Sequence, residues 1–213
     1  MTPSLFSLLF EETVSSAAVS GLALYDFYGE DGSSLWFVLY RLSQHGIPHI
    51  QAEIEIEPNA KCREYGKFWE VKRSAAEHGY GPLIYEIALS SDEVTKKNGV
   101  LLPDSISVSR DAQGVWSKFY KREDVEVVDL EQEKGCSGYR VNRFGGLSQG
   151  NFKAMGIRLK EPLDVSSLIE QHENNLFKFS ERIEYLIQEY VIEYFEDATH
   201  QPHEWEEDID DYD

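Results

Sequence analysis

Cysteine is scarce in this sequence. Its 213 residues contain only Cys62 and Cys136, which excludes a framework of several disulfides, and neither lies in a closely spaced pair of the kind that binds a metal ion. No apolar run approaches the roughly 18 residues that cross a bilayer. The N-terminal segment has an apolar patch but no basic residues before it, unlike a secretory signal peptide. These absences predict a cytoplasmic protein in a reducing compartment, without a metal site.

Basic residues are also few. Lys and Arg number 20 against 39 Asp and Glu, which gives a formal net charge of −19 at pH 7. Such a charge repels phosphates and argues against a nucleic-acid-binding surface, but it suits a basic partner or a protein that mimics nucleic acid. No Lys or Arg follows Arg182, whereas twelve acidic residues do, so residues 1–182 carry only −7. The end of the chain, 198–213, is therefore expected to be an exposed acidic tail.

Apolar residues are plentiful and regularly spaced. Hydrophobic residues make up 41% of the chain and aromatic residues 13%, enough for a packed globular core. Within residues 49–58, positions 50–57 alternate Ile or Ala with Gln or Glu, which predicts a strand with one solvated face. The order of elements predicts a mixed α+β fold with a βαβ crossover in its second half. The expected strands are 22–28, 35–43, 49–58, 68–75, 99–105 and 124–131, and the expected helices are 4–21, 82–89 and 109–122.

Beyond residue 134 the pattern changes. Residues 135–163 are rich in Gly, Ser and Asn and lack strong periodicity, which predicts an irregular linker after a first domain at 1–134. Residues 164–197 carry an amphipathic pattern that predicts one helix of roughly thirty residues. Its apolar stripe fits packing on the same domain or pairing with a second copy in a homodimer, and we favour the former. This stripe comprises Leu176, Phe179, Ile183, Leu186 and Tyr190, and it is widened by Ile187, Val191 and Tyr194.

A glycine-rich turn stands between the strand at 68–75 and the helix that follows. The residues Gly79, Tyr80, Gly81 and Pro82 form the sequence Gly-x-Gly-Pro. Proline suits the first helical turn, and glycines let an anion approach the backbone amides at the positive end of the helix dipole. The dinucleotide-binding and P-loop fingerprints are absent. The segment is therefore either a plain tight turn or a loop that holds phosphate.

In its context this loop resembles the coenzyme A-binding motif of the GNAT acyltransferase superfamily. That motif, Gln/Arg-x-x-Gly-x-Gly/Ala, follows the fourth strand and begins the next helix, and "AEHGYGPLIYEIAL" matches it at Gly79 and Gly81. Downstream, "SRDAQGVWSKFYKREDVEVV" is similar to the next unit of the family, with Ala112 and the pair Val115 and Trp116 in place. The resemblance covers roughly residues 20–130 and extends to divergent proteins of tailed bacteriophages. It implies a GNAT-like mixed central sheet flanked by helices, and a location in host cytoplasm or virion.

The resemblance also implies a co-substrate and roles for named residues. Acetyl-CoA or another acyl-CoA would be the acyl donor. Glu70 is the expected catalytic base, and its alternative role is a solvated strand carboxylate or a partner of Lys72. Tyr120 is the expected acid, because Trp116 stands where the family often has Tyr; Ala76 likewise replaces the Gln or Arg that opens the motif. The cofactor-binding residues implied are Val71, Lys72, Ser74, Glu77, His78, Gly79, Tyr80, Gly81 and Pro82.

The sequence supports two functions of different classes. The first is transfer of an acyl group from acyl-CoA to an amine, with an acidic surface that favours a basic acceptor such as a lysine, a polyamine or an amino sugar. The second is a non-catalytic GNAT-like binding protein, structural in a virion or inhibiting a host protein, which contacts its partner through the C-terminal helix and acidic tail. The Gly-x-Gly-Pro loop favours the first, and the replaced motif positions favour the second.

Overall fold

The computed structural model of the chain describes residues 21–29, 32–77, 79–133, 135–136, 138–144, 148–179 and 182–200. The expected opening helix, nearly all of the expected acidic tail and His78 lie outside these residues. Within them, no helix has the length and apolar character needed to cross a membrane.

Seven strands form the main sheet, in the order β1-β2-β3-β4-β5-β10-β7, and β6, β8 and β9 form a second, smaller sheet. In the main sheet neighbouring strands are antiparallel, except that β4 and β5 run parallel. The mixed α+β class and the strands expected before residue 134 are confirmed. The strand bounds are β1 Leu22–Tyr28, β2 Leu35–Leu42, β3 Pro48–Pro58, β4 Phe68–Ala76, β5 Val100–Leu102, β6 Ser107–Val108, β7 Val125–Asp129, β8 Arg140–Phe144, β9 Ser148–Lys153 and β10 Met155–Leu159.

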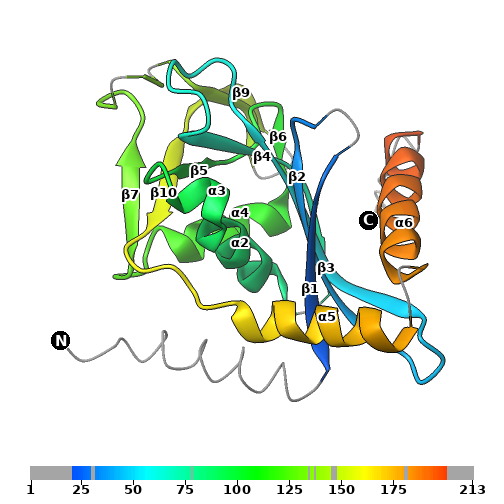
Figure 1. Ribbon diagram of the computed structural model, residues 1–213. Helices are drawn as coiled ribbons and strands as arrows, with labels where there is room; N and C mark the ends of the chain where they lie inside the picture. Colours follow the sequence, from blue (N-terminus) through cyan, green and yellow to red (C-terminus); the bar gives the residue numbers. More distant parts are fainter. Residues whose placement is uncertain are drawn as a thin grey trace, which may run out of the picture.

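Helices cover both faces of this sheet (Figure 1). The helix bounds are α2 Gly81–Ser90, α3 Asp92–Thr95, α4 Arg110–Phe119, α5 Ser166–Phe179 and α6 Arg182–His200. α2, α3 and α4 lie on one face, whereas α6 lies on the other. The helices expected after the glycine loop and near residues 109–122 are therefore confirmed as α2 and α4.

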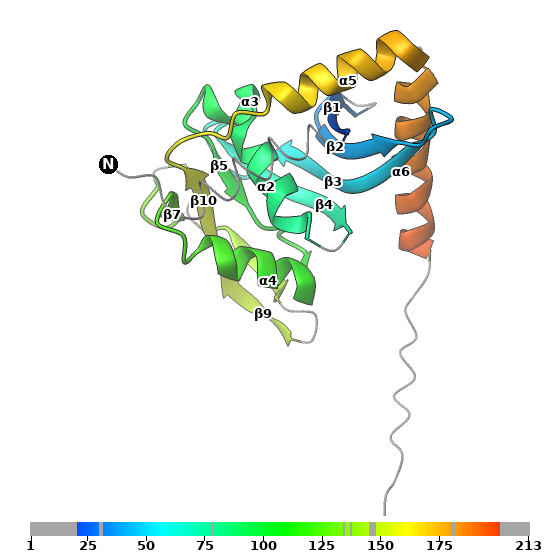
Figure 2. The same cartoon turned by 90° about the horizontal axis from the view of Figure 1, so that it is seen from below.

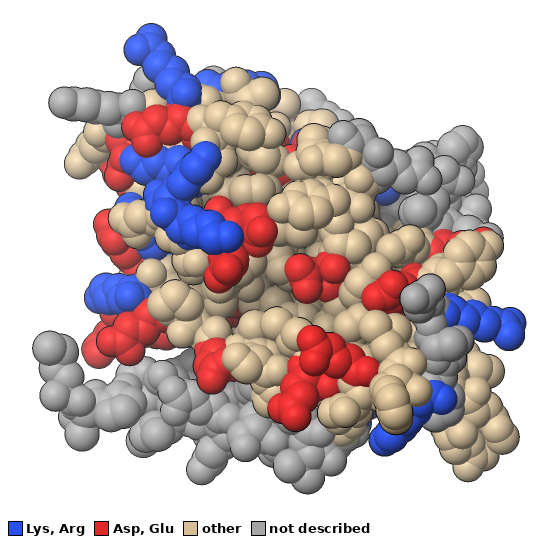
Figure 3. Space-filling model, in the orientation of Figure 1, with Lys and Arg blue, Asp and Glu red and all other residues tan. Residues whose placement is uncertain are grey.

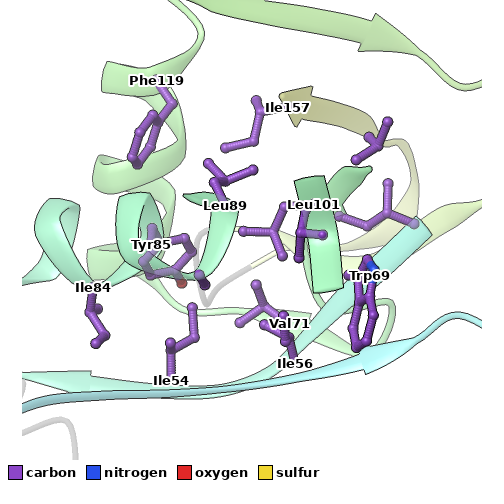
Figure 4. Close-up of a cluster of buried hydrophobic side chains, with 14 of the residues drawn as sticks. Ile54, Ile56, Trp69, Val71, Ile84, Tyr85, Leu89, Leu101, Phe119 and Ile157 are labelled. Atoms are coloured by element: carbon purple, nitrogen blue, oxygen red, sulfur yellow. The ribbon is translucent and has the colours of Figure 1, made fainter. Parts of the chain in front are cut away.

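The main core lies between the sheet and α2. Figure 4 shows Ile84, Tyr85 and Leu89 of α2 close to Ile54 and Val71 of the sheet. All five side chains are almost fully buried, which follows from the helical spacing in α2 and the alternation in the strands. This packing fixes α2 across β3 and β4, and so sets where its N-terminus lies.

The prediction that one face of β3 is solvated is wrong. Glu53 and Glu55 are only 2% and 8% exposed, because α6 packs over this side of the sheet. Glu55 pairs with Arg73, whose Nε lies 3.4 Å from its carboxylate. Oε2 of Glu53 has no hydrogen-bond partner within the described part of the chain, and burial raises the pKa of Glu53 to about 7. Alternation alone does not reveal a second covering layer from a distant segment.

The segment 135–163 is not the irregular linker that its composition predicts. It contains β8, β9 and β10, and β10 is inserted between β5 and β7 in the main sheet. Gly156 allows this close approach, since a Cβ at that position would lie 2.3 Å from Cγ1 of Val100. Strands of five or six residues with Gly and Asn show little periodicity, and here pairing with distant strands decides their structure.

The C-terminal segment forms two helices, not the single helix expected at 164–197. α5 packs on β1, and α6 turns away from it (Figure 2). Ile183, Ile187 and Val191 of α6 are buried in a second core with Val38 and Tyr40 of β2. The apolar side of α6 thus packs on the same domain through Ile183, Ile187 and Val191, whereas Tyr190 of the expected stripe is 48% exposed. The break was not predictable from spacing, because the stripe continues through it.

A disulfide joins the two cysteines. Cys62 follows β3 and Cys136 follows β7; both are buried, and their Cα atoms lie 4.4 Å apart across a sequence separation of 74 residues. The sequence excluded a framework of several disulfides but did not predict this pair. The bond connects the β3–β4 loop to the segment that leads into β8.

Candidate functional site

The main sheet opens where its two parallel strands separate. β5 pairs with β4 from Phe68 to Glu70 only, while β4 continues to Ala76 paired with β3 on its other side. Relative to β3, β4 has one extra residue at Lys72, which forms a bulge. In open sheets, ligands bind beyond the carboxyl ends of parallel strands. We call this region the β4–β5 fork, and define it as residues 71–76 of β4 with residues 103–105 after β5.

The glycine loop follows the fork and leads into α2. Gly79 has a φ of 96°, in the left-handed region that favours glycine. Tyr80 occupies the N-cap position of α2 without a side-chain cap, so this end of the helix presents N–H groups and a positive dipole end. The Glu77 amide, expected to hold phosphate, donates instead to the Gln51 carbonyl at 2.8 Å. The groups available to an anion are therefore those at the start of α2.

A basic side chain that the motif did not include lies beside this loop. Arg41 of β2 donates from Nη2 to the hydroxyl of Tyr80 at 2.9 Å. Its Nε is buried and has no hydrogen-bond partner among the described residues. A guanidinium presents five N–H donors in a planar fork suited to phosphate. No local sequence signal links Arg41 to the loop, because they meet only through the pairing of β2, β3 and β4.

Glu70 is held as a buried acceptor at the closed end of the fork. Its Oε2 accepts a hydrogen bond from the Asn59 side-chain amide, and its Oε1 accepts one from the Ser105 amide at 2.8 Å. Nζ of Lys72 lies 3.8 Å from Oε1. This geometry corresponds to the ion-pair role considered for Glu70, and it ties the chain after β5 to β4. A general base needs a carboxylate oxygen that faces the reacting amine, and both oxygens of Glu70 are engaged elsewhere.

Tyr120 is also committed to a structural contact. Its hydroxyl donates to the carbonyl of Met155 in β10 at 3.1 Å, and burial raises its pKa. The ring packs against Trp116 on α4. The structure thus places the two expected catalytic residues in different surroundings, Glu70 between β4 and the chain after β5, and Tyr120 between α4 and β10.

A second tyrosine, absent from the sequence-based site, reaches the fork. The hydroxyl of Tyr85 on α2 lies 3.0 Å from Oγ of Ser74 in β4. Trp116 packs edge-on against the Tyr85 ring with centroids 5.7 Å apart. The pKa of Tyr85 is raised, and burial is the largest cause. The negative charge of Asp104 raises it further, whereas interactions with Ser74 and Trp116 lower it. Apolar spacing in α2 marks Tyr85 as a core residue, so the sequence did not single it out.

Asp104 is the carboxylate whose negative charge raises the pKa of Tyr85. It directly follows β5 and Pro103, and its Oδ1 accepts the amide of Ile106 at 2.6 Å. The pKa of Asp104 is raised, and burial is the largest cause. The nearby charge of Glu70 also raises it, whereas the Ile106 hydrogen bond and the charge of Lys72 lower it. A carboxylate just beyond the end of a parallel strand is a signal that the sequence carried, once β5 is known to be parallel to β4.

Charges of both signs lie on the face that carries α2 (Figure 3). Acidic side chains spread over its centre and lower half, whereas Lys and Arg side chains gather toward the upper left and the right-hand edge. In the described part of this face the basic side chains do not form a continuous track of the kind that follows a nucleic-acid backbone. No group of three or more His, Cys, Asp and Glu side chains in the described residues is placed to hold a metal ion.

Comparison of the chain with protein-family models, with curated proteins and with solved structures finds no match.

Proposed function

We propose that the protein transfers an acyl group from an acyl-CoA thioester to an amine. The observation that carries the proposal is the β4–β5 fork, in which β4 continues past its last pair with β5 and leads into Gly79, Gly81 and the N-terminus of α2. This order, a fourth strand followed by a glycine loop and a helix, is the one in which the GNAT superfamily places its coenzyme A motif. The resemblance of the sequence and the arrangement of the fork support each other.

The cofactor's phosphates would bind at the start of α2. Backbone N–H groups and the helix dipole favour an anion there, and Arg41 adds the positive charge that Ala76 does not provide. The pantetheine arm would run back along residues 71–76, which continue β4 beyond its last pair with β5 at Glu70. At 3.3 Å per residue this stretch is about 20 Å long, which suits an extended chain.

Asp104 is the proposed proton acceptor for the amine. The amine nitrogen attacks the thioester carbon, the new C–N bond forms, the C–S bond breaks, and the ammonium proton passes to the Asp104 carboxylate. A half-buried carboxylate with a raised pKa is better matched to neutral pH than an exposed one. The neighbouring carboxylates of Glu70 and Asp104 favour a positively charged acceptor, such as a lysine side chain, a polyamine or an amino sugar.

Isothermal titration with acetyl-CoA, and with desulfo-CoA as a non-reacting analogue, tests the binding step. We expect micromolar affinity for both, and a loss of tenfold or more in Arg41→Ala. Lys96→Ala is the matched control, because it removes one positive charge at an exposed position after α3. Absence of binding up to millimolar concentration in the wild-type protein contradicts the proposal. Equal affinity in Arg41→Ala and Lys96→Ala removes Arg41 from the site.

A second function, protein binding without catalysis, is favoured by the outer faces of α5 and α6. Phe177 is 93% exposed, and Tyr185 and Tyr190 are also exposed. Aromatic side chains in such positions are enriched at protein interfaces. Light scattering of the wild type and of Phe177→Ser tests whether this surface joins two copies, with a dimer that dissociates in the variant as the supporting result.

A further inference from the structure

Asp104 is fixed through the residues on both sides of it. On one side, the hydroxyl of Tyr139 donates to the carbonyl of Pro103 at 2.6 Å. On the other side, the amide of Ser105 donates to Oε1 of Glu70 at 2.8 Å. Chemistry sets both directions, since a carbonyl only accepts and a backbone N–H only donates. The side chains of Tyr139 and Glu70 are buried, so two distant parts of the chain hold the backbone that carries Asp104.

Glu70 extends the connection between β4 and β5 beyond their ladder. The last backbone pair of the two strands joins Glu70 to Leu102. The side chain of Glu70 then reaches the amide of Ser105, three residues further along the chain. Its Oε2 accepts from the side-chain amide of Asn59, whose Oδ1 accepts the amide of Lys61 at 2.9 Å. The carboxylate is therefore held from the β3–β4 loop while it holds the chain after β5.

The charge of Glu70 also acts on Asp104. A neutral acceptor would hold the backbone equally well, but it would have no electrostatic effect. Glu70 raises the pKa of Asp104 and Lys72 lowers it, with Nζ of Lys72 3.8 Å from Oε1 of Glu70. Asp104 also interacts with the phenolic groups of Tyr85 on α2 and of Tyr139, which are neutral at pH 7. A like charge near a carboxylate makes that carboxylate a stronger base.

We propose that Glu70 and Tyr139 are positioning residues that hold Asp104 for proton transfer at the end of β5. The charge of Glu70 also strengthens Asp104 as a base. This inference rests on the proposed function, and it changes the role expected for Glu70 from base to support of the base. The ammonium proton passes to Asp104, while Glu70 and Tyr139 neither gain nor lose a proton. Tyr139 lies beyond the residues that resemble the GNAT superfamily, so the sequence did not indicate it.

Steady-state kinetics of single and double variants test the positioning role. Acetyl-CoA is the donor, and a panel of polyamines and lysine derivatives supplies the acceptor. We expect Asp104→Asn to lower kcat about 100-fold, and Glu70→Gln and Tyr139→Phe to lower it about tenfold each, with KM for acetyl-CoA unchanged. In the Asp104→Asn background neither second substitution should lower kcat further, because both residues act through Asp104.

The pH profile separates the effect of charge from that of position. The acid limb of kcat/KM should move to lower pH in Glu70→Gln, because the charge that raises the pKa of Asp104 is lost. It should stay in place in Tyr139→Phe, which removes one oxygen atom and no charge. Matched controls are the buried carboxylate variant Glu55→Gln and the second-core variant Tyr40→Phe, which should both keep the wild-type kcat and profile.

The outcomes separate the positioning role from the function on which it rests. Values of kcat within about threefold of the wild type in Glu70→Gln and Tyr139→Phe, beside a large loss in Asp104→Asn, overturn the positioning role and leave the transferase intact. Losses that multiply in the Asp104→Asn background, or an acid limb that stays in place in Glu70→Gln, also overturn the inference. An unchanged kcat in Asp104→Asn overturns the base and its support together.

A wild-type protein that binds desulfo-CoA but turns over none of the amines overturns the transferase and the positioning role together. Thermal melting close to that of the wild type identifies the variants that are folded. Tyr139→Phe is the smaller change, so it keeps the test decisive where Glu70→Gln is unstable.

Discussion

Arg41 on β2 donates a hydrogen bond to the hydroxyl of Tyr80, the N-cap residue of α2, across a sequence separation of 39 residues. The GNAT-like motif would carry its polar first residue at position 76, where this chain has Ala. The sheet brings a guanidinium to the same loop from a different strand. In the proposed acyltransferase site, Arg41 would supply the positive charge that Ala76 does not.

Gly79 is the glycine of the loop that the backbone requires. Its φ of 96° strains any residue with a Cβ, although a Cβ there would meet no atom within 4 Å. At Gly81 the nearest atom to a Cβ is Cγ2 of Val115 at 3.5 Å, an ordinary contact, and φ is not positive. We expect Gly79→Ala to lower the free energy of unfolding by about 1 kcal/mol and Gly81→Ala to lower it less. Urea unfolding of the two variants makes the comparison, and equal losses would contradict it.

The disulfide should contribute strongly to stability. It closes a loop of 74 residues, and the chain-entropy model assigns about 4 kcal/mol to a loop of this length. Asn59, three residues before Cys62, and Tyr139, three residues after Cys136, both lie at Glu70, so the bond also holds this network. We expect Cys62→Ser with Cys136→Ser to lower the denaturation midpoint in urea. Reduction of the wild type should have the same effect and should leave the double variant unchanged.

Glu86 of α2 and Arg122, which follows α4, form a buried ion pair. Nη1 and Nη2 of Arg122 each donate to a Glu86 oxygen at 2.9 Å, and both side chains are under 10% exposed. Removal of one partner leaves a buried charge, and such changes cost about 3–5 kcal/mol. We expect Glu86→Ala to fall in this range, moderated by the contact of Arg122 with Asp124. A loss below 1 kcal/mol in urea unfolding would show that the pair contributes little.

Local pattern predicted most elements of the fold but few contacts of the site. Strands β1 to β4 and helices α2 and α4 follow from periods of two and 3.6 residues, which each segment carries in itself. β10 was missed because a strand of five residues with Gly156 is defined by its neighbours β5 and β7. The burial of Glu53 was missed for a similar reason, because α6 covers it from over 120 residues away.

The residues of the candidate site likewise include some that the sequence predicted and some that it did not. The glycine loop was predicted, because its backbone requirement is written in consecutive residues. Arg41, Tyr85 and Asp104 were not predicted, because Arg41 reaches Tyr80, and Tyr85 reaches Ser74 and the charge of Asp104, only through the pairing and packing of distant segments. Of these three residues, only Asp104 could have been found from the sequence. It lies at the end of a predicted strand, and that position indicates a ligand site once β5 is known to run parallel to β4.

Glu53 should make the stability of the protein fall as pH rises. Burial raises the pKa of Glu53 from 4.5 to about 7, so the folded state binds more protons than the unfolded state between these values. This contribution is fully present below about pH 4.5 and is lost as pH rises through about 7. We expect Glu53→Gln to remove this decline in urea unfolding measured from pH 5 to 8. The exposed Glu161→Gln is the control and should keep it.

His172, on α5, should make the stability of the protein fall as pH is lowered, which is opposite to the effect of Glu53. Its Nδ1 lies 2.7 Å from the hydroxyl of Tyr40, its Nε2 lies 3.4 Å from Glu184 of α6, and its ring stacks on Tyr25. Burial lowers the pKa of His172, which outweighs the opposing effect of the carboxylates around it, those of Glu184, Asp26 and Glu173.

The folded state consequently binds fewer protons at His172 than the unfolded state, so this contribution is present above the ordinary pKa of about 6.5 and is lost as pH falls below it. We expect the free energy of unfolding of His172→Gln to change less between pH 7 and pH 5 than that of the wild type, because the variant has no proton to take up at this site. His45→Gln, at an exposed turn, is the control. A wild-type dependence that persists unchanged in His172→Gln would place the titrating group elsewhere. Since α5 and α6 pack on the sheet through this cluster, its loss at low pH should loosen the two helices first, and hydrogen exchange at their amides measures this directly.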